Sequence, residues 1–346
     1  MNNGERPHSA GPSIWVWAFG YFAAYAPYSA LTKALSDGRL GDKVSGNTIL
    51  PVSTMSSFVA MVIFVFATGW WRFATRRKVG SFEVPTPTRW TALSGLCGAT
   101  ILTTTTLAYT IEGVSIVFMM LLMRGGVLLM APLVDALSGR KVRWYSWLAL
   151  GLTLLSLAVA TLGRAELKFS GLAILNVALY LTAYFIRLRF MSRLAKSDAK
   201  DVTKRYFVEE QLISTPAALL ALGVFALIGQ GSLLEFRQGF TEFPFTSQVG
   251  WAVLIGVLSQ GTGVFGALVL LDKSENSFSV PVNRASSVLA GVLATLTMFA
   301  LGLGKPLDLS EGIGAALVVC AILVLSIAPM REAKQKLRSS ASPPAP

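Results

Sequence analysis

Two arginines interrupt apolar segments of the sequence and are well suited to bind an anion. Arg124 lies near the middle of the run 114–137, and Arg284 lies about a third of the way into the run 277–303. A charged side chain at the centre of a bilayer costs roughly 2.5 to 3.5 kcal/mol on insertion scales, so neither arginine is expected to face lipid. A guanidinium binds a carboxylate or phosphate through paired hydrogen bonds. The two residues therefore favour a site for an anionic ligand.

A structural role is the alternative for both arginines. Either could neutralise an acid or bond to carbonyls freed by a proline, and the candidates are Asp135, Glu209, Glu210 and Pro281. The three acids lie within roughly a turn of the predicted cytoplasmic boundary, and no Asp or Glu reaches the centre of a run. Proton-coupled export of organic cations usually needs a buried carboxylate for which proton and drug compete. The sequence disfavours that mechanism.

Aromatic and amide side chains inside other runs could hydrogen-bond and stack a sugar or base. Tyr21, Tyr25 and Tyr28 follow an i, i+4, i+7 spacing, which places them on one face of a helix. The candidate substrate-binding residues, besides the arginines, are Asn283, Tyr25, Tyr28, Tyr180 and Gln260. The alternative for each of them is helix packing, because polar side chains also join membrane helices.

Other chemistries lack the residues they need. The single histidine is at position 8, and both cysteines, Cys97 and Cys320, lie in apolar runs, so neither a metal site nor a disulfide is expected. The sequence contains no GxSxG or HExxH motif and no pair of central carboxylates. We therefore expect no enzyme and no cofactor.

The composition predicts the elements that must position these residues. Hydrophobic residues make up 53% of the chain and charged residues 14%, against about 25% charged in soluble domains. Apolar runs of about 20 residues recur, which is the length of a membrane-spanning helix. We predict an all-α polytopic membrane protein with ten transmembrane helices at residues 14–35, 49–70, 90–111, 114–137, 144–163, 170–190, 206–229, 248–271, 277–303 and 309–328.

Positive charge orients these helices. With the N-terminus inside, 21 of the 30 Lys and Arg residues fall in cytoplasmic segments and 6 in outside loops. This bias predicts that both termini are cytoplasmic. A bacterial inner membrane fits the pattern, and an organellar membrane would give much the same sequence. The net charge of +12 thus reflects loop placement, and no nucleic-acid partner is expected.

The chain is expected to contain an internal repeat. Trp90, Leu93 and Gly95 match Trp251, Leu254 and Gly256 at an offset of 161 positions. Because each half has an odd number of helices, the second half must enter the membrane with opposite polarity. The predicted domains are a cytoplasmic tail at 1–13, inverted five-helix repeats at 14–163 and 164–330, and a disordered tail at 331–346.

The segments 124–157 and 281–326 each combine a helix, a short glycine-containing turn with a charged residue, and a closing helix rich in small residues. In this they resemble the drug/metabolite transporter superfamily, in its ten-helix EamA-like branch, and the related nucleotide-sugar and triose-phosphate translocators. The chain departs from the Gly-Glu-Arg or Gly-Glu-Pro turn of that family, since Gly139 precedes Arg140 and Lys141. The resemblance implies that the fourth and ninth helices line a central cavity, where both arginines could reach one ligand.

Together these observations predict a secondary transporter, an exporter or exchanger, that moves a small polar metabolite by alternating access. The arginines favour an anionic substrate. A lipid or polyprenyl-phosphate flippase remains an alternative, as does a multidrug or amino-acid exporter. The expected partners are the small-molecule substrate and membrane lipid, and a homodimer is compatible with the sequence.

Overall fold

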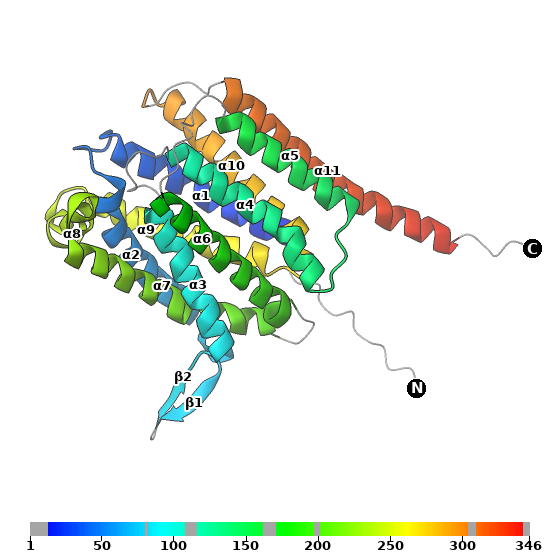
Figure 1. The fold of residues 1–346 in the computed structure, drawn as a ribbon, viewed down its shortest axis with the longest axis horizontal. Coiled ribbons are helices and arrows are strands. Elements are labelled where there is room, and N and C mark those ends of the chain that lie inside the picture. The colour runs from blue at the N-terminus through cyan, green and yellow to red at the C-terminus, as the bar shows by residue number, and fades with distance from the viewer. Residues whose placement is uncertain are drawn as a thin grey trace, which may run out of the picture.

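The computed structural model describes residues 13–79, 82–107, 116–161, 171–196, 201–303 and 309–341. These residues form a bundle of long helices with one small hairpin (Figure 1). The helices are α1 (Ile14–Ser36), α2 (Gly46–Ala67), α3 (Arg89–Leu107), α4 (Ile116–Leu137), α5 (Trp144–Thr161), α6 (Gly171–Phe190), α7 (Val202–Ile228), α8 (Leu234–Thr241), α9 (Val249–Leu270), α10 (Asn276–Ala300) and α11 (Leu309–Ala341). The strands are β1 (Arg76–Val79) and β2 (Phe82–Pro85).

The chain is an α-helical membrane protein. Within the described residues, five helical segments are long and apolar enough to cross a bilayer: Gly46–Ala67, Gly171–Ala195, Val202–Ile228, Val249–Leu270 and Asn276–Ala300. Leucines such as Leu220 and Leu227 point outward from these segments with 73% and 79% exposure, whereas Glu209 and Glu210 are completely buried. Exposed apolar and buried charged side chains are the distribution expected when the surrounding solvent is lipid. Helices α1, α3, α4, α5 and α11 occupy the other five predicted spans.

Small residues allow the helices to pack closely. Gly20 of α1 faces the ring of Phe265 on α9, and Gly256 of α9 faces the backbone of Ser53 on α2. A side chain at either glycine would collide with its neighbour, so these contacts depend on the missing Cβ. The packed helix pairs include α1 with α9 and α10, α2 with α9, α3 with α6 and α7, α4 with α6 and α10, and α5 with α11.

Two short elements were not predicted. The antiparallel strands β1 and β2 project from the bundle between α2 and α3 (Figure 1). The completely buried Glu209 of α7 holds the base of this hairpin, since its carboxylate accepts hydrogen bonds from the backbone NH and hydroxyl of Thr75 and from the backbone NH of Thr88. Helix α8 packs near the opposite end of α7 through Phe236, whose ring centroid lies 5.7 Å from that of Phe225.

Residues 331–341, part of the tail predicted at 331–346, belong to helix α11 in the structure. Helix α11 continues without a break to Ala341, and its last part extends beyond the bundle (Figure 1). The segment after Met330 is rich in Ala, Glu, Lys, Gln, Leu and Arg, which have high helix propensity. Extending an existing helix also avoids the cost of nucleation. Most of the predicted N-terminal tail, 1–13, lies outside the described residues.

Candidate functional site

Tyrosines from two helices form the aromatic part of the candidate site. On α1, the ring centroids of Tyr21 and Tyr25 are 5.5 Å apart, and those of Tyr25 and Tyr28 are 5.6 Å apart. On α6, the centroids of Tyr180 and Tyr184 are 4.9 Å apart. The spacing within each pair is i, i+4 or, for Tyr25 and Tyr28, i, i+3, and both spacings place the rings along one helix face. Tyr21, Tyr180 and Tyr184 are buried.

Both predicted arginines join these tyrosines. The Nη2 of Arg284, on α10, donates to the hydroxyl of Tyr184 at 2.9 Å, and the guanidinium lies 5.4 Å from the centre of the same ring. Arg124 on α4 lies within electrostatic reach of Tyr21 and Tyr180, as Arg284 does. We call Tyr21, Tyr25, Tyr180, Tyr184, Arg124 and Arg284 the tyrosine–arginine cluster. It brings four helices, α1, α4, α6 and α10, to one place.

The cluster retains hydrogen-bonding capacity. Among the described residues, the Nε of Arg284 is buried and has no hydrogen-bond partner. A buried donor without an acceptor is costly, typically about 1 to 3 kcal/mol and more for a charged group. The phenol groups around it can both donate and accept. The arrangement can therefore bind a ligand that presents anionic oxygen atoms to Arg284 and an apolar or planar face to the tyrosines.

The remaining predicted site residues lie at the edge of this cluster or away from it. The amide of Asn283 donates to the backbone oxygen of Gly266 at 3.3 Å, next to the ring of Tyr21. Gln260 accepts a hydrogen bond of 3.0 Å from Ser57, so it joins α9 to α2. Tyr28 packs against the apolar cluster around Leu35 and Val44. The structure thus brings Arg124, Arg284, Tyr25 and Tyr180 together with Tyr21 and Tyr184. Tyr28 continues the row of tyrosines on α1, and the buried Nε2 of Gln260 has no hydrogen-bond partner among the described residues.

The acids proposed as structural partners of the arginines are engaged elsewhere. Asp135 on α4 accepts four hydrogen bonds from the backbone and side chains of Asn276 and Ser277, which start α10. Glu209 binds the hairpin base as described above. Glu210 binds Arg187 through two hydrogen bonds of 2.7 and 3.1 Å. Arg284 instead has Tyr184 as its polar partner.

Arg187 is a largely buried cation, 13% exposed, that was not predicted as a site residue. It lies inside α6, and the completely buried Glu210 of α7 is its ion-pair partner. Ser94 of α3 donates to the same carboxylate at 2.7 Å and shares a hydrogen bond of 2.6 Å with Tyr206. One signal was available: an arginine near the end of one apolar run and a glutamate near the start of the next are well placed to pair across a short connection.

A second buried cation, Lys196, lies one residue beyond the apolar segment that ends at Ala195. Its Nζ donates to the backbone oxygen of Ser274 at 2.8 Å and to the hydroxyl of Ser279 at 3.2 Å. Burial, reinforced by the positive charge of Arg140, lowers the pKa of Lys196 to about 7, although Asp135, Asp272 and Glu275 oppose that shift. The amine is therefore neutral in the folded protein at alkaline pH.

This shift predicts how stability depends on pH. Because the pKa of Lys196 is lower in the folded than in the unfolded chain, the unfolded chain binds more protons between about pH 7 and 10. The contribution of Lys196 to the free energy of unfolding should then rise with pH, by at most about 1.4 kcal/mol per pH unit. Thermal unfolding in detergent should show this rise in the unmodified protein and in Lys141→Met, an exposed control. If stability rose with pH to the same extent in Lys196→Met, Lys196 would not be the cause of the rise.

Comparison with known proteins identifies the fold only. No family model matches the chain, and no curated protein matches its sequence. Solved structures do resemble it, 27 chains in all. One, described only as the crystal structure of a protein, has a TM-score of 0.57 at 14% identity, and the similarity covers 91% of this chain and 99% of that one. The fold is therefore shared with a solved protein over nearly its whole length.

Proposed function

We propose that this chain is a secondary transporter that moves a small polar anionic metabolite by alternating access. The observation that carries the proposal is the tyrosine–arginine cluster, in which Arg284 has an unused buried donor and lies beside Tyr184. Arginines inside a membrane bundle are costly and commonly mark substrate pathways. Asp135, Glu209 and Glu210 bind other residues and form no ion pair with Arg284, so the charge of Arg284 is available to a ligand.

The proposal includes ten spans arranged as two inverted repeats. In this arrangement α1 to α5 correspond to α6, α7, α9, α10 and α11. Exchanging the halves turns the pair α1–α9 into α6–α3, α1–α10 into α6–α4, and α2–α9 into α7–α3, while α5–α11 maps onto itself. All of these pairs are packed in the structure. A two-fold relation between halves explains why the contacts occur in matched sets, and it supports an exchange between two packings.

Close-packed glycines support the same correspondence. A Cβ on Gly95 of α3 would meet the backbone oxygen of Glu210 and the side chain of Ile213 on α7. A Cβ on Gly256 of α9 would meet the backbone oxygen of Ser53 and the side chain of Ser56 on α2. Gly95 and Gly256 are 161 positions apart, the offset found in the sequence. The matched interfaces thus use glycine at corresponding positions.

We also propose that both termini face the cytoplasm, in a bacterial inner membrane, because positive charge concentrates in the segments on that side. A cysteine at Lys141 should then react with an impermeant thiol reagent from one side, and a cysteine at Lys305 from the other. The background for both is Cys97→Ala with Cys320→Ala, which removes the native thiols. Labelling of both positions from the same side would contradict the inverted repeat.

Transport in liposomes tests the function itself. Purified protein should accelerate exchange of a water-soluble phosphorylated or carboxylated metabolite across the liposome membrane, and the rate should saturate with its concentration. Liposomes without protein are the control. Exchange of lipophilic cations alone would contradict the anionic substrate, and scrambling of a labelled lipid headgroup without solute exchange would support a flippase instead.

A further inference from the structure

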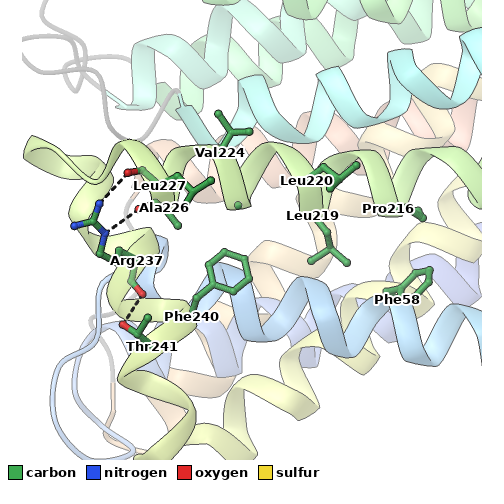
Figure 2. A pocket seen from close by; sticks show the side chains of 11 residues that line it. Phe58, Pro216, Leu219, Leu220, Val224, Ala226, Leu227, Arg237, Phe240 and Thr241 are labelled. Carbon is green, nitrogen blue, oxygen red and sulfur yellow. Dashed lines mark hydrogen bonds between the residues drawn. The ribbon is translucent and has the colours of Figure 1, made fainter.

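An apolar groove of about 820 Å³ lies between α2, α7 and α8, apart from the tyrosine–arginine cluster (Figure 2). Its wall on α7 includes Pro216, Leu220, Gly223 and Leu227, and Phe58 of α2 lies at the Pro216 end. Nothing lies within 4 Å of where a Cβ on Gly223 would be, so the missing side chain leaves open space in the wall. The groove is therefore a preformed depression on an apolar span.

The opposite end of the groove carries a cation. Arg237 of α8 lies beside Leu227 and Ala226, and Phe240 lies between it and the deeper part of the groove (Figure 2). Its Nε donates to the backbone oxygen of Ala226 and its Nη2 to that of Leu227, each at 2.9 Å. These bonds hold the guanidinium at the end of α7. They use two of its five N–H groups, and the exposed side chain can offer the others to a ligand.

The dimensions of the groove match one leaflet of a membrane. Pro216 and Leu227 are eleven residues apart on α7, which corresponds to about 17 Å at the rise of an α-helix. The hydrocarbon core of a bilayer is about 30 Å thick, so half of it is close to this length. If the groove is aligned with one leaflet, Arg237 is level with the lipid headgroups and the apolar wall is level with the acyl chains.

We propose that the groove binds an anionic phospholipid, with an acyl chain against α7 and the phosphate on Arg237. This site goes beyond the proposed transport function and does not depend on it. The charge at one end and the apolar wall over the remaining length complement a ligand with an anionic head and an extended tail. A second copy of the chain is the alternative occupant, and it would have to place an acidic side chain against Arg237.

The test uses the full chain, delipidated in detergent, with dioleoyl phosphatidylglycerol and dioleoyl phosphatidylcholine as probes. Native mass spectrometry measures the retained lipid, and thermal unfolding measures stabilisation, since a ligand that binds only the folded state raises its apparent stability. We expect phosphatidylglycerol to be retained preferentially. Arg237→Gln should weaken its binding about tenfold, because a charge-assisted hydrogen bond is lost.

Gly223→Leu should remove retention of both lipids, because the new side chain fills the open space in the groove wall. Gly151→Leu on α5 is the matched control, since nothing lies within 4 Å of where its Cβ would be and it does not line the groove. Equal retention of the two lipids by the unmodified chain would overturn the proposal, as would unchanged retention in Gly223→Leu. So would a dimer that Gly223→Leu dissociates without any change in bound lipid.

Discussion

Replacing Arg284 with alanine is expected to weaken substrate binding by at least about tenfold and to reduce exchange in liposomes to a small fraction of the unmodified rate. The side chain has a buried Nε without a partner, and its Nη2 is held by Tyr184. A hydrogen bond to a charged group contributes about 1.5 to 3 kcal/mol, and 1.4 kcal/mol corresponds to a tenfold change in affinity. Exchange measured over a range of substrate concentrations gives both the affinity and the maximal rate.

Three further variants identify what Arg284 does. Arg284→Lys keeps the charge but loses the planar fork, so it should retain part of the affinity. Arg124→Ala should have an effect of the same direction, because Arg124 acts on the same tyrosines. Arg193→Ala, an exposed cation beyond α6, should leave exchange unchanged. Normal substrate affinity in both Arg284→Ala and Arg124→Ala would exclude an anion site in the tyrosine–arginine cluster.

Replacing Arg187 with methionine is expected to lower the free energy of unfolding by about 3 to 5 kcal/mol, because Glu210 then remains buried without a counter-charge. Glu210 is completely buried and receives hydrogen bonds from Arg187 and Ser94. The double variant Arg187→Met with Glu210→Leu removes both charges and should recover most of the lost stability. Denaturant unfolding in mixed micelles measures each value.

An exposed ion pair provides the comparison. Lys33 and Asp37 are 2.9 Å apart, and their side chains are 66% and 37% exposed. Lys33→Met should change the free energy of unfolding by less than about 0.5 kcal/mol, because water already solvates both groups. An equal cost in Arg187→Met and Lys33→Met would show that the Arg187–Glu210 pair is not buried in the folded protein.

The positions of the helices could be predicted because each depends on a local apolar run. The runs 49–70 and 248–271 correspond closely to α2 (Gly46–Ala67) and α9 (Val249–Leu270). The hairpin and α8 could not be predicted in this way, because distant residues stabilise them. Glu209 binds Thr75 across 134 positions, and Phe236 packs on α7. Short elements of this kind leave little periodic signal in the sequence.

The candidate site could be predicted only in part. Residue type identified Arg124 and Arg284 as functional candidates, because a charge within an apolar run is unusual. The partner of Arg284 could not be identified, since Tyr184 is 100 positions away and meets it only through the packing order of α6 and α10. Gln260 could not be assigned a role from its type, because its carbonyl oxygen binds Ser57 on α2 while its buried Nε2 has no partner among the described residues. Polarity alone does not separate the two roles.

Asp135 restricts which movements the bundle can make at low cost. Its carboxylate joins α4 to the first residues of α10 through the four hydrogen bonds to Asn276 and Ser277, in a place closed to solvent. Separating these helix ends would leave the carboxylate of Asp135 and the first NH groups of α10 without hydrogen-bond partners, unless water entered at the same time. Movements in which α4 and α10 tilt about this junction keep its hydrogen bonds and should cost little. Movements that separate the two helices here require water to enter.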